Sequence, residues 1–178
     1  MITIGVLGLC IRPSDGALLM AKHTWDYFKN GSTWKFVGGG VEAGELPEDA
    51  MRREWQEELG IDFTVKGLVA VAHRAEGDQT HVVYIFDGDC DWRQIHVDHQ
   101  ELARFGWVTR RRLATLQAHR QLLSPRDHFL SHYLLENGSI WRIPASDYVA
   151  PADAREGVQR TAFYIAGYAS PRSAGATF

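Results

Sequence analysis

Three glutamates stand at a spacing that would place them side by side on a helix. Glu57 and Glu58 follow Glu54 by three and four positions, and residues so spaced are neighbours on a helical surface. Like charges at this spacing destabilise a helix by roughly 0.2–0.5 kcal/mol per pair, a cost that a solvated outer face tolerates. The three glutamates also follow a glycine-rich stretch, and hard divalent cations prefer clustered oxygen ligands. The pattern therefore favours a magnesium site over a merely charged surface.

The residues around these glutamates carry the local signals of a helix from Pro47 to Leu59. Pro47 suits the first helical turn, where a backbone N–H needs no partner, and Gly60 suits the left-handed position after the last turn. Met51, Trp55 and Leu59 recur every four positions and form an apolar stripe that would face the core. The glutamates would occupy a neighbouring face.

The stretch from Gly39 to Ile61, GGVEAGELPEDAMRREWQEELGI, resembles the Nudix box, G-x5-E-x7-R-E-U-x-E-E-x-G-U, where U is a bulky aliphatic residue. Trp55 departs from the aliphatic preference but keeps its position apolar, so it should affect packing more than chemistry. Val37 stands where many family members have proline. The remaining specified positions are met by Gly39, Glu45, Arg53, Glu54, Glu57, Glu58, Gly60 and Ile61.

This resemblance implies an enzyme of the Nudix pyrophosphohydrolase type, which acts on acid anhydrides with the help of Mg²⁺ or Mn²⁺. Glu54, Glu57 and Glu58 would bind the metal, and Glu57 or Glu58 could also be the general base. Arg53 and Glu45 would brace the loop against the helix and orient Glu54. Glycine permits close backbone approach and exposes N–H groups to anions, so the substrate's phosphates would meet Gly38, Gly39 and Gly40.

A further carboxylate, Glu101, precedes a short apolar segment that ends near Trp107. In several family members a glutamate from this region supplies a metal ligand or the general base, and the spacing to Trp107 is similar. The alternative is a solvent-facing loop carboxylate. The sequence is compatible with both interpretations, and Glu101 is a catalytic candidate.

The histidines and the run of three arginines are better explained as surface residues than as functional sites. His128 and His132 could face one another on a helix, but the glutamate of the zinc-protease signature is missing, which favours an ordinary surface pair. His96 and His99 lie in a polar stretch near Glu101 and are expected to be solvated. The run 110–112 of three arginines is interpreted as a solvated helix start.

Aromatic residues concentrate in the loop from His23 to Thr33, before the Nudix box. Trp25 and Phe28 have flat apolar faces that could stack on a base or enclose another apolar group. They are therefore the candidates for substrate specificity. Trp34, which begins a strand, is at least as well explained as a core residue.

The order of the remaining elements predicts an α/β fold of the Nudix type, an α/β/α sandwich around a mixed and largely antiparallel sheet. Strands are expected at 2–11, 17–21, 34–37, 64–74, 80–87 and 105–108, and further helices at 111–117 and 126–135. The first two strands are predicted to form a hairpin across the turn at 13–16. We expect a Nudix hydrolase domain over residues 1–137 and a C-terminal extension, 138–178, that packs in part on the domain.

Composition limits the partners and the compartment. The 178 residues are 45% hydrophobic and 23% charged, with a net charge of −3, which is typical of a globular protein without a basic surface for bulk nucleic acid. The apolar start, Ile2 to Ile11, lacks the basic flank of a signal peptide. No stretch approaches the roughly 20 apolar residues of a membrane span. Cys10 and Cys90 are interpreted as reduced thiols of a cytoplasmic protein, which acts on a small diphosphate and could form a homodimer.

The sequence leaves two alternatives open for the function. The leading substrate is a nucleoside triphosphate or a nucleoside diphosphate derivative, but a non-nucleotide diphosphate, prenyl or sugar-linked, is the alternative within catalysis. A ligand-sensing Nudix protein without turnover is the alternative outside it. The sensor is disfavoured for two reasons. Such regulators usually add a DNA-binding module, and no basic helix-turn-helix pattern appears in the sequence; in addition, every carboxylate of the box is present.

Overall fold

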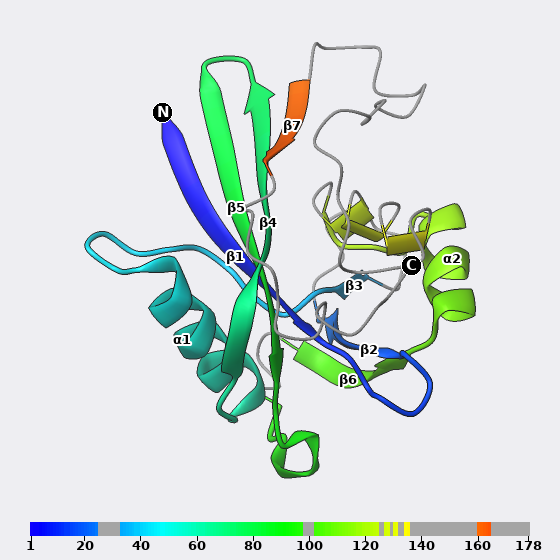
Figure 1. Ribbon diagram of the computed structural model, residues 1–178. Helices are drawn as coiled ribbons and strands as arrows, with labels where there is room; N and C mark the ends of the chain where they lie inside the picture. Colours follow the sequence, from blue (N-terminus) through cyan, green and yellow to red (C-terminus); the bar gives the residue numbers. More distant parts are fainter. Residues whose placement is uncertain are drawn as a thin grey trace, which may run out of the picture.

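The computed structural model describes residues 1–24, 33–97, 102–124 and 160–164, together with six positions between 127 and 135. Two sheets form the centre of the molecule (Figure 1). The first contains β1 (Ile2–Cys10), β5 (Gln79–Asp89), β4 (Thr64–Glu76) and β7 (Arg160–Tyr164), in that order. The second contains β3 (Trp34–Lys35), β2 (Leu18–His23) and β6 (Leu102–Val108). Among the strands of the described residues, β1 and β5 pair in parallel and the other strand pairs are antiparallel.

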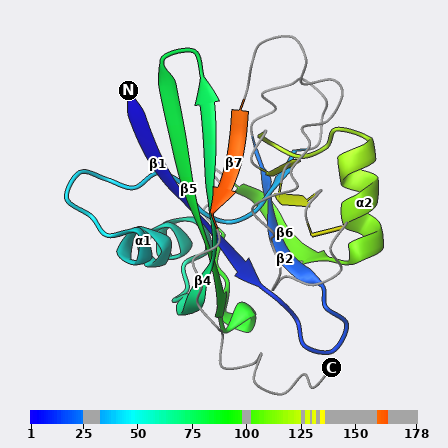
Figure 2. The same ribbon diagram turned by 45° about the horizontal axis from the view of Figure 1, so that its top comes forward.

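The two sheets separate the two named helices, as both views show (Figures 1 and 2). α1 (Pro47–Leu59) covers one side and α2 (Arg110–Ala118) the other, and a 3₁₀ helix, η1 (Trp92–Gln94), follows β5. This arrangement confirms the predicted α/β/α sandwich with a mixed, largely antiparallel sheet. β1 and the start of β2 are nearly continuous hydrophobic runs, because both faces of these strands are covered.

Alternate residues of the central strands enter two different cores. On β1, Leu7 and Leu9 join the cluster that packs against α2, whereas Val6 joins the cluster that packs against α1. β2 divides in the same way, with Met20 on the α2 side and Leu19 on the α1 side. Successive side chains of a strand point to opposite faces, so these two strands are buried on both.

The predicted hairpin of the first two strands is wrong. The chain does turn after β1, where the Arg12 N–H donates to the Ala17 carbonyl at 2.8 Å. Beyond the single bridge between Ile11 and Leu18, however, β2 turns away into the second sheet, and β1 pairs with β5 instead. The local turn signal was correct, but strand partners are decided by burial of both faces, which a short sequence window does not contain.

The β4–β5 connection is a true hairpin. Glu76 pairs with Gln79 across it, and Gly77 takes a positive φ of 59°, a conformation that glycine adopts without strain. β7 adds to the open edge of β4, so a short part of the segment after residue 137 lies in the sheet. The domain boundary at 137 and 138 stays a prediction. No helix in the described parts of the chain is long and apolar enough to cross a membrane.

Candidate active site

α1 begins and ends at the residues that the sequence predicts. Pro47 occupies the first turn, and Glu48 and Asp49 stand at the positive end of the helix dipole. Gly60 closes the helix in the left-handed conformation, with φ of 65° and its N–H bonded to the Gln56 carbonyl. The apolar stripe is buried as expected, since Met51, Trp55 and Leu59 are all 0% exposed. This packing fixes the rotation of α1, and therefore the direction in which its glutamates point.

Arg53 lies at the centre of the polar face of α1 and binds three carboxylates. Its Nε donates to Glu45 Oε1 at 2.9 Å and its Nη2 to Glu45 Oε2 at 3.0 Å, a two-pronged contact. Its Nη1 donates to Glu54 at 3.0 Å and to Glu57 at 2.9 Å. Its Nη2 also donates to the Gly40 carbonyl at 2.8 Å. We call this set of contacts the Arg53 clamp; it ties the helix to the loop that precedes it, as the sequence predicts.

The electrostatics of the clamp follow from these contacts. Hydrogen bonds to Glu45 above all, and then to Glu54 and Glu57, raise the pKa of Arg53, so the guanidinium stays charged. The same contact with Arg53 lowers the pKa of Glu45. Glu54 differs, because burial outweighs its bond to Arg53 and raises its pKa. Burial thus makes the charged form of Glu54 less favourable than that of Glu45.

Gly39 makes room for the Glu54 carboxylate. A Cβ at Gly39 would overlap the carboxylate of Glu54, and a Cβ at Gly38 would overlap the backbone of Val6 on β1. The Gly39 carbonyl accepts the Val6 N–H at 2.9 Å. The sequence predicts that the backbone at these glycines approaches a partner closely. In the structure that partner is the protein itself, namely Glu54 and β1. This close approach brings the loop 38–40 between β1 and the polar face of α1.

Lys35 adds a second cation that the sequence reasoning missed. Its ammonium forms a short ion pair with Glu58 and donates to the Gly38 carbonyl at 3.0 Å. Both side chains are buried, at 7% and 4% exposure, whereas Glu57 is 58% exposed. Two signals were available: Glu58 follows the buried Met51 by two helical turns, and Lys35 interrupts an apolar strand. Glu58 is thus a buried residue and not part of a solvated face.

A family model described as "NUDIX domain" matches residues 1–132, which contain all of these residues. The chain belongs to the Nudix family. The Arg53 clamp, the glycine loop and the carboxylates of α1 lie within the matched region. The prediction of an enzyme of the Nudix pyrophosphohydrolase type is thereby confirmed.

Relatives and solved structures agree with this membership. The chain is 36% identical over 112 residues to "Nucleoside triphosphatase NudI" of Escherichia fergusonii, covering 57% of this chain and 79% of the relative. It is 34% identical over 117 residues to the protein of that name from an Enterobacter strain, covering 60% and 82%. The solution structure of the E. coli ORF135 protein superimposes with a TM-score of 0.58 at 25% identity, over 74% of this chain and 86% of that one. A MutT protein from Methanosarcina mazei matches in fold, with a TM-score of 0.57 at 19% identity, over 77% and 94%.

The polar face of α1 fits a divalent cation in donor type and in charge. Hard cations such as Mg²⁺ are bound through carboxylate oxygens. The cluster carries an excess of two negative charges, because four carboxylates face two cations: Glu45, Glu54, Glu57 and Glu58, with Arg53 and Lys35. In the described part of the chain, no three acidic, histidine or cysteine side chains are arranged to hold a metal as they stand. The carboxylates that would bind a metal here pair with Arg53 and Lys35 in this structure.

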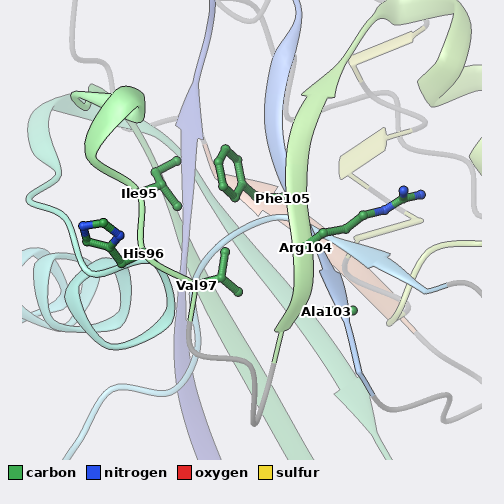
Figure 3. Close-up of a pocket in the computed structure, with 6 residues that line it drawn as sticks. All are labelled: Ile95, His96, Val97, Ala103, Arg104 and Phe105. Atoms are coloured by element: carbon green, nitrogen blue, oxygen red, sulfur yellow. The ribbon is translucent and has the colours of Figure 1, made fainter.

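A pocket of about 400 Å³ opens between the segment after η1 and strand β6 (Figure 3). Ile95, Val97 and Phe105 point into it, whereas His96 and Arg104 extend away from it. The His96 N–H donates to the Leu59 carbonyl at 2.8 Å, so this wall of the pocket is attached to the last turn of α1. The pocket residues flank the segment that contains Glu101.

Several predicted residues lie outside the described part of the chain. Glu101, Trp25 and Phe28 are among them, as are His99 and His132, so their predicted roles remain predictions. Trp34 is a core residue, 7% exposed. The three arginines 110–112 do begin a solvated helix, α2, whose first turn is capped by the Thr109 side chain.

Proposed function

We propose that this Nudix protein hydrolyses a phosphoanhydride bond of a nucleoside triphosphate or a nucleoside diphosphate derivative, by attack of water on phosphorus. The observation that carries the proposal is the Arg53 clamp, which gathers Glu45, Glu54 and Glu57 around one guanidinium beside the glycine loop. The two relatives named nucleoside triphosphatase support a nucleotide as the substrate.

The proposed site uses a divalent cation, Mg²⁺ or Mn²⁺, held by Glu54, Glu57 and Glu58. When bound, such a cation neutralises phosphate charge, polarises the phosphorus and lowers the pKa of the attacking water. Arg53 would orient Glu54, and Glu45 would hold Arg53 in place. The general base would be one of three carboxylates, Glu57, Glu58 or Glu101.

Specificity would come from outside the box, because the box meets only phosphates and metal. Trp25 and Phe28 remain the proposed contacts for the base. The pocket beside Phe105 is a second candidate for the organic part of the substrate, since its apolar walls border the segment that holds Glu101. Aromatic stacking on a base is worth about 1–3 kcal/mol, enough to favour a nucleotide over a diphosphate that has no apolar or aromatic group.

The test is a substrate screen with Mg²⁺ in ¹⁸O-water. Nucleoside triphosphates, nucleotide sugars, dinucleoside polyphosphates and prenyl diphosphates are each incubated with the full chain, and product masses locate the attacked phosphorus. We expect a nucleotide to be the best substrate, with ¹⁸O incorporated into a phosphate product. Preference for a prenyl or non-nucleotide sugar diphosphate would replace the nucleotide proposal, and binding without turnover of any compound would make the protein a sensor.

A further inference from the structure

Two cysteine thiols from distant parts of the chain lie in contact beside the first sheet. Cys10 is the last residue of β1, and Cys90 directly follows β5. Their Sγ atoms are 3.4 Å apart although 80 positions separate them in sequence. The contact results from the parallel pairing of β1 and β5, which sets Cys10 opposite Gly88 and ends both strands at the same edge. The chain has two cysteines in all, and both are free thiols here.

The two thiols differ in access and in acidity. Cys10 is 4% exposed, whereas Cys90 is half-buried, so a reagent from solution meets Cys90 first. The hydrogen bond between them lowers the pKa of Cys10 and raises the pKa of Cys90. The thiolate form is therefore favoured on Cys10 and disfavoured on Cys90. Because thiolates are the attacking species in disulfide exchange, Cys90 reacts first through its access to solvent, and the more acidic Cys10 supplies the thiolate for the second step.

We propose that Cys10 and Cys90 are a modification site, a dithiol that low-molecular-weight disulfides oxidise to a reversible intramolecular disulfide. The Cys90 thiolate attacks one sulfur of the reagent, whose S–S bond breaks and releases one half as a thiolate. The Cys10 thiolate then attacks Cys90 Sγ and displaces the other half. The protein loses two electrons and two protons, which the two released thiols take up. The sulfurs need to approach by about 1.4 Å to reach disulfide distance.

The cross-link would anchor a segment that borders α1. Asp91, next to Cys90, caps η1 by accepting the Arg93 N–H at 3.3 Å, and the chain then reaches His96, bonded to the Leu59 carbonyl. The disulfide would join the start of this segment to β1. Because it closes a long loop, it should also raise the midpoint of thermal unfolding, by roughly 4–16 °C.

The experiment treats the reduced, desalted full chain with one equivalent of 2,2′-dithiodipyridine. The measurements are released 2-thiopyridone by absorbance, intact mass, and a peptide map without reductant. We expect two thiopyridones per chain, a mass lower by two hydrogens, a peptide joining Cys10 to Cys90, and full reversal by dithiothreitol. One thiopyridone with a retained pyridyl adduct, a cross-link between two chains, or unreacted thiols would each overturn the proposal.

Single serine variants provide the matched controls. Cys10→Ser keeps the accessible thiol alone, so it should retain the pyridyl adduct that the parent releases. Cys90→Ser keeps the buried thiol alone and should react more slowly than the parent. If the parent retains the adduct at the same rate and extent as Cys10→Ser, then Cys10 does not displace it and the pair is not a dithiol site. The result on the parent protein decides the matter even if a variant folds poorly.

Discussion

Glu57 and Glu58 are adjacent in the Nudix box, but they differ in burial and in the cation that each contacts. Glu58 is buried against Lys35, and Glu57 is 58% exposed on the rim of the Arg53 clamp. A carboxylate that neutralises a buried ammonium contributes to stability whether or not it also binds metal. Substitutions at the two positions should therefore separate a folding role from a chemical one.

We predict that Glu58→Gln destabilises the fold as well as the site. Removing one partner of a buried ion pair leaves the other charge uncompensated and costs about 3–5 kcal/mol. Lys35→Met should cost a comparable amount, and the double variant should cost less than the sum of the two. The measurement is urea unfolding of the four proteins. Strictly additive losses would show that Lys35 and Glu58 are not coupled.

Glu57→Gln should instead leave the fold intact and remove most of the turnover. Its ion pair with Arg53 is solvent-exposed, and such pairs contribute little to stability. Loss of a metal ligand or general base should lower the rate on the order of 10²-fold or more. Steady-state kinetics at saturating Mg²⁺ test this, with Glu48→Gln as the control, since Glu48 carries the same charge on the exposed first turn of α1. Turnover within a few-fold of the parent would remove Glu57 from the site.

The Arg53 clamp should also appear in the acid stability of the protein. Its contact lowers the pKa of Glu45, so the folded state holds this proton less tightly than the unfolded chain. The stabilisation is fully present above the unfolded pKa, about 4.3 for glutamate, and is lost as the pH falls through the lower folded value. We expect Glu45→Gln to show a shallower loss of stability below about pH 5 in urea unfolding. Parallel pH profiles for variant and parent would contradict this.

At the level of elements, the sequence predicts α1 well because its signals are local. Pro47, the apolar stripe and Gly60 fix its ends and its buried face, and helical spacing then brings Arg53 and its glutamates together. Helical spacing from Met51 also places Glu58 toward the buried face, but it does not reveal its partner, because β3 supplies Lys35 from outside the helix. Local periodicity gives the face of a helix, but not what packs against its edges.

Trp55 stands where the Nudix box usually has an aliphatic residue, and substitutions at this position test whether the tryptophan serves packing. It is 0% exposed and stacks on Phe63 with ring centroids 4.2 Å apart, and a Cβ at Gly8 would crowd its indole. Trp55→Ala should leave a cavity and cost about 3–5 kcal/mol, with little change in the turnover of the folded fraction. Trp55→Phe is the matched control and should cost less. An unchanged melting midpoint with lost activity would place Trp55 in the site instead.

For the molecule as a whole, the contacts that the sequence did not predict are those between distant strands. β1 pairs with β5, about 80 positions later, and this one pairing displaces the expected hairpin and brings Cys10 to Cys90. β7 joins β4 across a still longer separation. Such pairings depend on how whole sheets are buried between α1 and α2. Composition and pattern therefore predicted the layers, while the partners within each layer required the structure.

The charge of the assembled cluster leads to a prediction for the intact protein. Four carboxylates and two cations from β3, α1 and the chain just before α1 leave an excess of two negative charges, which one divalent cation would neutralise. A ligand that binds only the folded state stabilises it, by about 2.7 kcal/mol at 100 times its Kd. For a domain of this size, that raises the melting midpoint by roughly 5–11 °C. We therefore expect Mg²⁺ added to chelator-treated protein to raise the midpoint, and Glu57→Gln to lose most of the rise while Glu48→Gln keeps it. An equal rise in all three proteins would mean that Mg²⁺ acts as bulk salt, and no rise in the parent would mean that the cluster does not bind it without substrate.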